Sequence, residues 1–341
     1  MGNMGHKLTD KEKLVLWGLT GYPGLKDVEV SKKLGIERRT FSAVKTKLKN
    51  RGVFSTLTVP DFNALGCKLL TVCYGRFNPM VPYDDRKEGV QKIRECEEII
   101  HVYSTDRKFL LLCASKNFTE FRKKAAEILR FYKQNNFLED VTHVHFPLEI
   151  SRYRFFGFSE LIKDIFGLDI ECENKNENPA ERIRLTKNEK KVLCALVEMP
   201  DAKNDEITVR TKVSTHVVSR IKKKLFENGI IKLRNIPDLK LLGFELIAFM
   251  HIKYKIDKGN EHEHQPAEIF GINSDAESAT FCLFKNYTDY EEYYNRKLQY
   301  LGENDLIDEE PAVLLFPVQK LKPAKEFSFA PLVKKVLEID S

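Results

Sequence analysis

Two segments of the 341-residue chain gather basic and hydroxyl side chains on one face of a predicted helix. In the first segment they are Arg38, Arg39, Thr40, Ser42, Lys45, Thr46 and Lys49, and in the second they are Ser214, Thr215, His216, Ser219, Arg220, Lys222 and Lys223. Arginine and lysine donate hydrogen bonds to phosphates and guanine edges, while serine and threonine make adaptable contacts. The chemistry that this pattern predicts is binding of double-stranded DNA.

The opposite face of each predicted helix carries apolar residues at spacings of three and four. They are Phe41, Val44 and Leu48 in the first segment, and Val218, Ile221 and Leu225 in the second. This spacing forms one buried stripe on a helix that runs from about Arg38 to Asn50. Gly52 and Gly229 follow as left-handed C-caps. The basic face is therefore expected to point outward.

Further helices precede each basic helix. Thr9 with Glu12, and Thr186 with Glu189, form a capping box that begins a helix, and a short helix follows at about Lys26–Leu34. The segments Val53–Val59 and Ile230–Ile236 read as β-wings, whose Lys232 and Arg234 would reach the DNA backbone or minor groove. Three helices and a wing predict a winged helix-turn-helix, whose third helix enters the major groove. The alternative is a winged helix used for protein contact or as scaffolding.

The whole chain is one unit written twice. Residues 8–69 align without a gap with residues 185–246, and about a third of the aligned positions are identical. The similarity resumes where Lys116–Thr119 matches Lys285–Thr288, and Phe146-Pro147 matches Phe316-Pro317. This period predicts two copies of one architecture, joined by the polar linker Glu171–Pro179.

The charge lies mostly on the first module of each copy. The net charge is +6, yet residues 1–66 hold 12 basic and 6 acidic side chains, about +6, and residues 181–243 hold 15 and 8, about +7. The remainder is near −7. Two basic modules on an acidic remainder indicate a nucleic-acid partner; the alternative is that these charges only solvate helix faces.

The second module of each copy predicts the order βαββαβ, a ferredoxin-like unit, so the fold class is α+β. The first copy reads as strands at Cys67–Phe77, Ile99–Ser104, Phe109–Ser115 and Val141–Leu148, with helices at about Arg86–Cys96 and Thr119–Asn135. The second copy reads as strands at Leu246–Tyr254, Ile272–Ser274, Ala279–Lys285 and Val313–Lys320, with helices near Glu261–Phe270 and at Tyr290–Leu301. The expected domains are helix-turn-helix modules at 1–64 and 181–241, α/β domains at 65–150 and 242–322, and aromatic amphipathic tails at 151–180 (with the linker) and 323–341.

This order of parts resembles the leucine-responsive regulator/AsnC family of transcription regulators, here as a tandem version. The resemblance rests on the helix-turn-helix with Arg220–Ile231 and on Leu242-Gly243 before a strand. It implies DNA bound by paired helices, dimerisation through the sheets and an effector such as an amino acid, which the turns with Thr105, Asp106, Arg107, Ser274 and Asp275 would contact. The chain departs from the family in its two copies, in a sensor turn without glycine, and in its added tails.

Duplication predicts that the two sheets pair within one chain, and we expect two chains to form a homodimer. The tails, Tyr153–Leu168 and Phe327–Ile339, carry aromatic residues that are costly to leave in water, so each should pack on its own or the partner's sheet.

Other chemistry is weakly signalled. The seven cysteines form no C-x-x-C pair and read as buried free thiols. His262 and His264 read as a solvated loop, so no metal and no cofactor are expected. Apolar runs are too short to span a membrane and no targeting segment is evident, which predicts a cytoplasmic protein.

No Walker loop and no G-x-G-x-x-G, G-x-S-x-G or H-E-x-x-H motif occurs, so an enzyme is not the main interpretation. One enzyme alternative rests on a resemblance to sirohaem decarboxylases, tetrapyrrole enzymes of this architecture that are made of two related halves. Its candidate residues would be His101, His143, His145, Arg107 and Arg152. A third interpretation is a nucleic-acid- or protein-binding adaptor.

Overall fold

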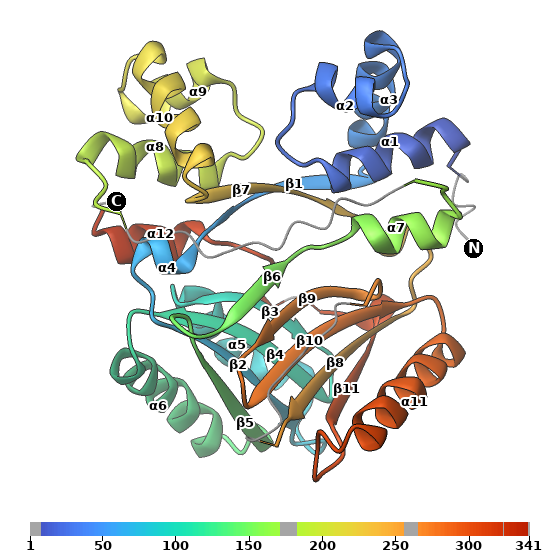
Figure 1. The fold of residues 1–341 in the computed structure, drawn as a ribbon. Coiled ribbons are helices and arrows are strands. Elements are labelled where there is room, and N and C mark those ends of the chain that lie inside the picture. Colours follow the sequence, from blue (N-terminus) through green and yellow to red (C-terminus); the bar gives the residue numbers. More distant parts are fainter. Residues whose placement is uncertain (1–7, 171–182, 256–264, 323, 340–341) are drawn as a thin grey trace.

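The computed structural model describes residues 8–170, 183–255, 265–322 and 324–339. Two helical heads stand side by side at one end of the molecule, a two-stranded ribbon runs beneath them, and two sheets with flanking helices form the other end (Figure 1). The fold is α+β, and each half of the chain supplies one head and one α/β domain.

Each head is a three-helix unit, and the helix positions predicted from sequence are confirmed. Their bounds are α1 Asp10–Gly21, α2 Asp27–Lys33 and α3 Arg38–Asn50 in the first head, and α8 Lys187–Glu198, α9 Asn204–Thr211 and α10 Thr215–Glu227 in the second. Both predicted capping boxes form, since Thr9 and Thr186 accept from the backbone N–H of Glu12 and Glu189. Gly52 and Gly229 end the third helices with φ near +66°.

The strands that the sequence assigns to two wings pair with each other. β1 (Phe54–Pro60) runs antiparallel to β7 (Ile231–Pro237) in a two-stranded ribbon that joins the halves. Each strand has its partner some 180 residues away. The prediction that Lys232 and Arg234 lie on a wing is therefore wrong. Two carbonyls, those of Phe155 and Leu233, each accept a 3.0 Å hydrogen bond from the Arg234 guanidinium.

The first α/β domain has the predicted βαββαβ order. Its elements are β2 Leu69–Phe77, α5 Lys87–Glu95, β3 Ile99–Ser104, β4 Lys108–Ser115, α6 Phe118–Gln134 and β5 Leu138–Pro147, with the short 3-10 helix η1 Tyr83–Arg86 before α5. All strands are antiparallel, in the spatial order β3-β4-β2-β5. Asn117 caps α6 by accepting from the N–H of Glu120, as its place before the helix predicts.

The second α/β domain repeats this sheet with one helix fewer among the described residues. Its elements are β8 Leu246–Lys253, β9 Glu268–Asn273, β10 Glu277–Phe284, α11 Tyr287–Glu303 and β11 Ala312–Pro317, followed by the short 3-10 helix η2 Val318–Lys320. The helix predicted near Glu261–Phe270 is wrong where it is described, because residues 268–270 are strand and pair with β10; residues 261–264 lie outside the described part.

The two tails cross between the halves. β6 (Arg152–Phe155), from the end of the first half, adds to β9 as an edge strand of the second sheet. In return, Lys322 and residues 324–328 run along β3 of the first sheet, with the N–H of Val102 donating to the carbonyl of Lys325. After each crossing the chain forms a helix: α7 (Ser159–Phe166) packs on α1 of its own half, and α12 (Ala330–Leu337) packs on α8 of its own half and on the short α4 (Phe62–Leu65) of the first half. The expectation that each tail packs on a sheet holds for its extended part, whereas α7 and α12 pack on other helices.

The two sheets pack face to face within one chain, as the duplication predicts. Tyr74 of β2 contacts Phe249 of β8 at a ring-centroid distance of 5.0 Å, and Tyr103 of β3 contacts Phe281 of β10 at 6.0 Å. One continuous core joins both sheets to both heads. Six cysteines are buried and free, and Cys172 lies outside the described residues. None of the described helices is both long and apolar enough to cross a bilayer.

Candidate nucleic-acid interface

The outward face of α3 carries cations because its inward face is used for packing. Phe41 and Leu48 are fully buried against the first head. Arg38 and Arg39, at the start of the helix, are exposed and make no ion pair with any residue in the described ranges. No acidic residue lies within α3. The N-terminal end of this helix is thus positively charged and open to solvent.

The remaining candidates on α3 have partners. Ser42 donates to one carboxylate oxygen of Asp27, and Lys45 contacts the other at 2.7 Å. Thr46 donates to the carbonyl of Ser42 in its own helix, and Lys49 forms a 2.8 Å ion pair with Asp201 of the second head. Thr40 is half-buried. A polyanion would meet Arg38 and Arg39 first and would compete with carboxylates for Lys45 and Lys49.

The matching face of α10 is less basic but also open. His216, Ser219 and Arg220 are exposed, Lys222 is half-buried, and none of these four has a partner among the residues that the structure describes. Thr215 contacts Thr208 and Asp205, and Lys223 lies 3.6 Å from Glu227. The buried stripe is Val218, Ile221 and Leu225, as predicted.

Some basic residues of the heads pair with buried carboxylates of the first helices, which the spacing does not reveal. Lys47 and Arg51 contact the buried Glu12 at 3.0 and 2.8 Å. The backbone N–H of Thr9, together with these cations, lowers the pKa of Glu12 to about 2. In the second head Lys224 contacts Glu189 at 2.6 Å. These cations connect the third helix of each head to its first helix, and their charges are paired within the protein.

The two heads are presented at the same end of the molecule, with the sheets at the other end (Figure 1). The β1–β7 ribbon and the Lys49–Asp201 ion pair connect them. One chain therefore displays two third helices with different outward residues, as Arg38 and Arg39 align with Thr215 and His216.

The residues predicted to contact an effector lie on two turns of different sheets. Thr105, Asp106 and Arg107 form the β3–β4 turn, where Thr105 accepts from two backbone N–H groups and Lys322 holds the carboxylate of Asp106 at 2.6 Å. This ion pair lowers the pKa of Asp106. Ser274 and Asp275 form the β9–β10 turn. The fold does not gather the five residues into one site.

The residues of the enzyme alternative do not converge either. His101 is buried on the inter-sheet side, stacked 3.7 Å from Phe327, and burial lowers its pKa to about 3. His143 and His145 lie on the other face of the first sheet, against Phe121 of α6. Arg107 lies in an exposed turn and Arg152 on β6.

One polar cluster between the sheets escapes sequence reasoning. The hydroxyl of Tyr74 lies 3.1 Å from Nδ1 of His251, whose Nε2 lies 3.7 Å from Glu277. Tyr74 and His251 occupy equivalent positions of the two copies, on β2 and β8. That equivalence is the only signal in the sequence. Within the described ranges no group of three residues could hold a metal ion, and His262 and His264 lie outside those ranges.

Comparison with known proteins identifies solved structures with a similar fold. No protein-family model and no curated protein matches the chain. The siroheme decarboxylase NirDL matches 96% of the chain and 98% of its own length, with a TM-score of 0.52 and 13% identity. NirDL in complex with an iron-uroporphyrin III analogue matches at a TM-score of 0.53, 13% identity and 96% and 99% coverage. An AsnC family transcriptional regulator from Agrobacterium tumefaciens covers 41% of the chain and 90% of its own length, with a TM-score of 0.35 and 15% identity. The chain thus has an α+β fold of two units, each a three-helix head followed by a ferredoxin-like domain, like that of NirDL.

Proposed function

We propose that the chain is a sequence-specific double-stranded DNA-binding transcription regulator. The observation that carries the proposal is that Arg38, Arg39 and Arg220 are exposed on the outward faces of the third helices and have no partner among the described residues. Cationic side chains that form no ion pair inside the protein remain available to DNA phosphates. Neutralising these phosphates releases the counterions condensed on the DNA, which favours binding.

The proposed contacts lie on α3 and α10. They are Arg38, Arg39, Thr40, Ser42, Lys45, Thr46, Lys49, Thr215, His216, Ser219, Arg220, Lys222 and Lys223. Lys232 and Arg234 drop out of this set because they belong to the β1–β7 ribbon. Since the two helices present different side chains, the two half-sites should differ in sequence. The resemblance to the leucine-responsive regulator/AsnC family also predicts a homodimer with four heads and an amino-acid effector at the two turns.

Binding to random-sequence duplex DNA at increasing salt tests the proposal. A DNA binder that neutralises several phosphates loses affinity steeply, with the logarithm of the association constant falling linearly against the logarithm of salt concentration. Selection of preferred sites from the bound fraction should then enrich two unlike half-sites. No binding at low salt would refute the proposal.

A second candidate function is a tetrapyrrole enzyme, which the likeness to NirDL over nearly the whole chain favours. Against it, the space between the sheets is filled by aromatic rings: Phe249, Phe270, Phe281 and Phe316 are all buried, and Phe281 lies 4.9 Å from Phe270. A macrocycle would have to displace them. Titration with iron-uroporphyrin III separates the candidates, since an enzyme of this kind should bind it in a one-to-one ratio with a shift of its absorption bands.

A further inference from the structure

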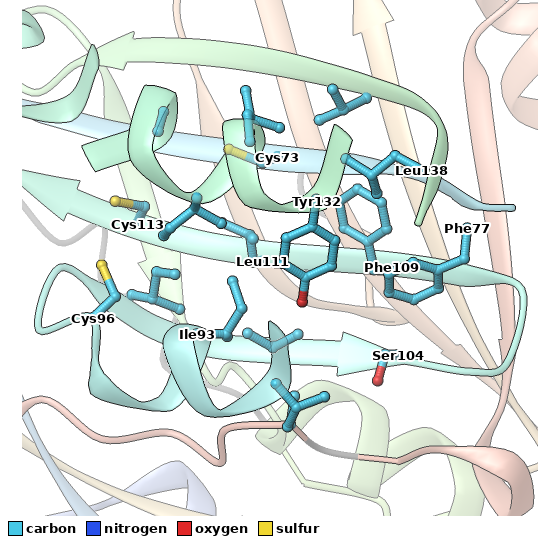
Figure 2. A pocket seen from close by; sticks show the side chains of 18 of the residues that line it. Cys73, Phe77, Ile93, Cys96, Ser104, Phe109, Leu111, Cys113, Tyr132 and Leu138 are labelled. Carbon is cyan, nitrogen blue, oxygen red and sulfur yellow. The ribbon is translucent and has the colours of Figure 1, made fainter. Parts of the chain in front are cut away.

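The first α/β domain contains a cavity between its sheet and its two helices. The cavity has a volume of about 90 Å³. Its walls are mostly apolar and come from β2, β3, β4, α5 and α6; Cys73, Ile93, Leu111 and Tyr132 are among them (Figure 2). One water molecule needs roughly 10–15 Å³, so the space exceeds a packing defect. Apolar walls offer water few hydrogen-bond partners, which favours an apolar occupant.

One cation borders this apolar space without adequate partners. Arg86 lines the cavity, is only 2% exposed, and finds no hydrogen-bond partner for Nε or Nη1 among the residues that the structure describes. Its Nη2 donates to the carbonyl of Asp106 at 2.8 Å, and its guanidinium lies 4.0 Å from the ring centroid of Phe77. A buried charge with open donors is costly unless an anion pairs with it. The planar fork of a guanidinium matches the two oxygens of a carboxylate.

The neighbours of Arg86 leave it available to such an anion. The nearby carboxylate of Asp106 is engaged by Lys322 at 2.6 Å, so within the described residues Arg86 has a backbone carbonyl and aromatic rings as neighbours but no carboxylate partner. Phe77, Tyr83 and Val90, which also line the cavity, are half-buried rather than buried. These side chains mark the side of the cavity through which a small molecule could enter.

We propose that this cavity binds a small amphipathic carboxylate, with its hydrocarbon chain between the sheet and helices α5 and α6 and its carboxylate on Arg86. The site is separate from the proposed DNA interface. Its test measures ligand binding directly, so it stands or fails independently of DNA binding.

Calorimetric titration of the full chain with sodium octanoate, with butyrate and with 1-octanol tests the proposal. Octanoate should bind in a one-to-one ratio, about tenfold or more tighter than octanol, because a hydrogen bond to a charged group outweighs one to a neutral group. Butyrate should bind more weakly because it buries less apolar surface. Arg86→Met should reduce octanoate affinity to that of octanol. Arg130→Met, which changes an exposed arginine of α6, should change nothing.

A second variant fills the cavity with larger side chains. Cys73→Met with Lys124→Tyr brings in the side chains of the second copy, Met250 and Tyr293, at equivalent positions. This variant should lose octanol as well as octanoate, which removal of a charge alone would not do. Equal affinity for octanoate and octanol, unchanged binding in the filled variant, or no binding of any probe would overturn the proposal. If Arg86→Met does not fold, the first two results still decide it.

Discussion

The two α/β domains share their strands and their long helix, and they differ in what occupies the space between sheet and helix. The first domain leaves a cavity beside Arg86. In the second, the fully buried Glu268 fills the equivalent space, accepting from the hydroxyl of Tyr293 at 2.9 Å and pairing with Lys297 at 3.5 Å. The matching residues of the first domain are Ile99, Lys124 and Ile128.

This difference shows how the two copies of a duplicated domain can acquire different interiors. Among the described residues, one copy has a cavity between sheet and helix, and the other has a buried polar network at the equivalent positions. Such networks are costly to disrupt, because each member becomes an unsatisfied group when its partner is lost. The comparison therefore makes predictions about stability as well as about binding.

The largest effect should follow from breaking the network of the second domain. Glu268→Ile leaves Lys297 and the hydroxyl of Tyr293 without their acceptor, and should lower the free energy of unfolding by about 3 kcal/mol. Adding Lys297→Ile recreates the first domain's pair, Ile99 and Ile128, and should restore most of the loss, since apolar residues replace a buried ion pair at little cost. Urea unfolding midpoints measure both. A double variant as unstable as the single one would show that the network does not explain the difference.

The second effect concerns the two heads. Glu12 has two cationic partners and Glu189 has one, so Glu12→Gln should cost about 2 kcal/mol at pH 7 and Glu189→Gln less. The pKa of Glu12 in the folded protein is about 2, below its usual value of 4.5. Its stabilisation is therefore present above pH 4.5 and is lost as the pH falls through 2. The stability difference between wild type and Glu12→Gln, measured by thermal unfolding, should shrink between pH 5 and pH 2. A pH-independent difference would contradict the role of the charge.

Sequence patterns within one helical turn predicted much of the fold. The predictions that failed concern contacts between residues that are far apart in the sequence. The capping boxes at Thr9 and Thr186 and the glycine after each third helix act within one turn, so the sequence reveals them. The pairing of β1 with β7 does not follow from local pattern, since a wing strand and a linking strand look alike until the partner is known. Arg86 escaped notice for the same reason, because a cavity exists only once α5 and α6 are packed on the sheet.

The third effect separates the two recognition helices. Arg38→Ala with Arg39→Ala, and Arg220→Ala with Lys223→Ala, should each weaken DNA binding about tenfold and reduce the salt slope by about two, because each variant removes two phosphate donors. Each should also relax the preference for one half-site only. Gel-shift titrations against salt, followed by site selection, measure this. Arg122→Ala with Arg130→Ala, on α6 at the sheet end, is the matched control. If both helix variants relax the same half-site, the two heads are not reading separate sequences.

The smallest effect tests the link between the heads. Lys49 of α3 is a proposed DNA contact, yet it pairs with Asp201 of the second head, and both side chains are about half exposed, at 44% and 50%. An exposed pair contributes at most about 1 kcal/mol to stability. Asp201→Asn should therefore leave the melting temperature nearly unchanged and should strengthen DNA binding about twofold, because it frees Lys49 and removes a negative charge from the interface. Asp308→Asn, which breaks the exposed pair with Lys255 in the second α/β domain, should alter neither quantity. Weaker DNA binding by Asp201→Asn would instead mean that the ion pair sets the spacing of the two helices, and that the heads act as one unit.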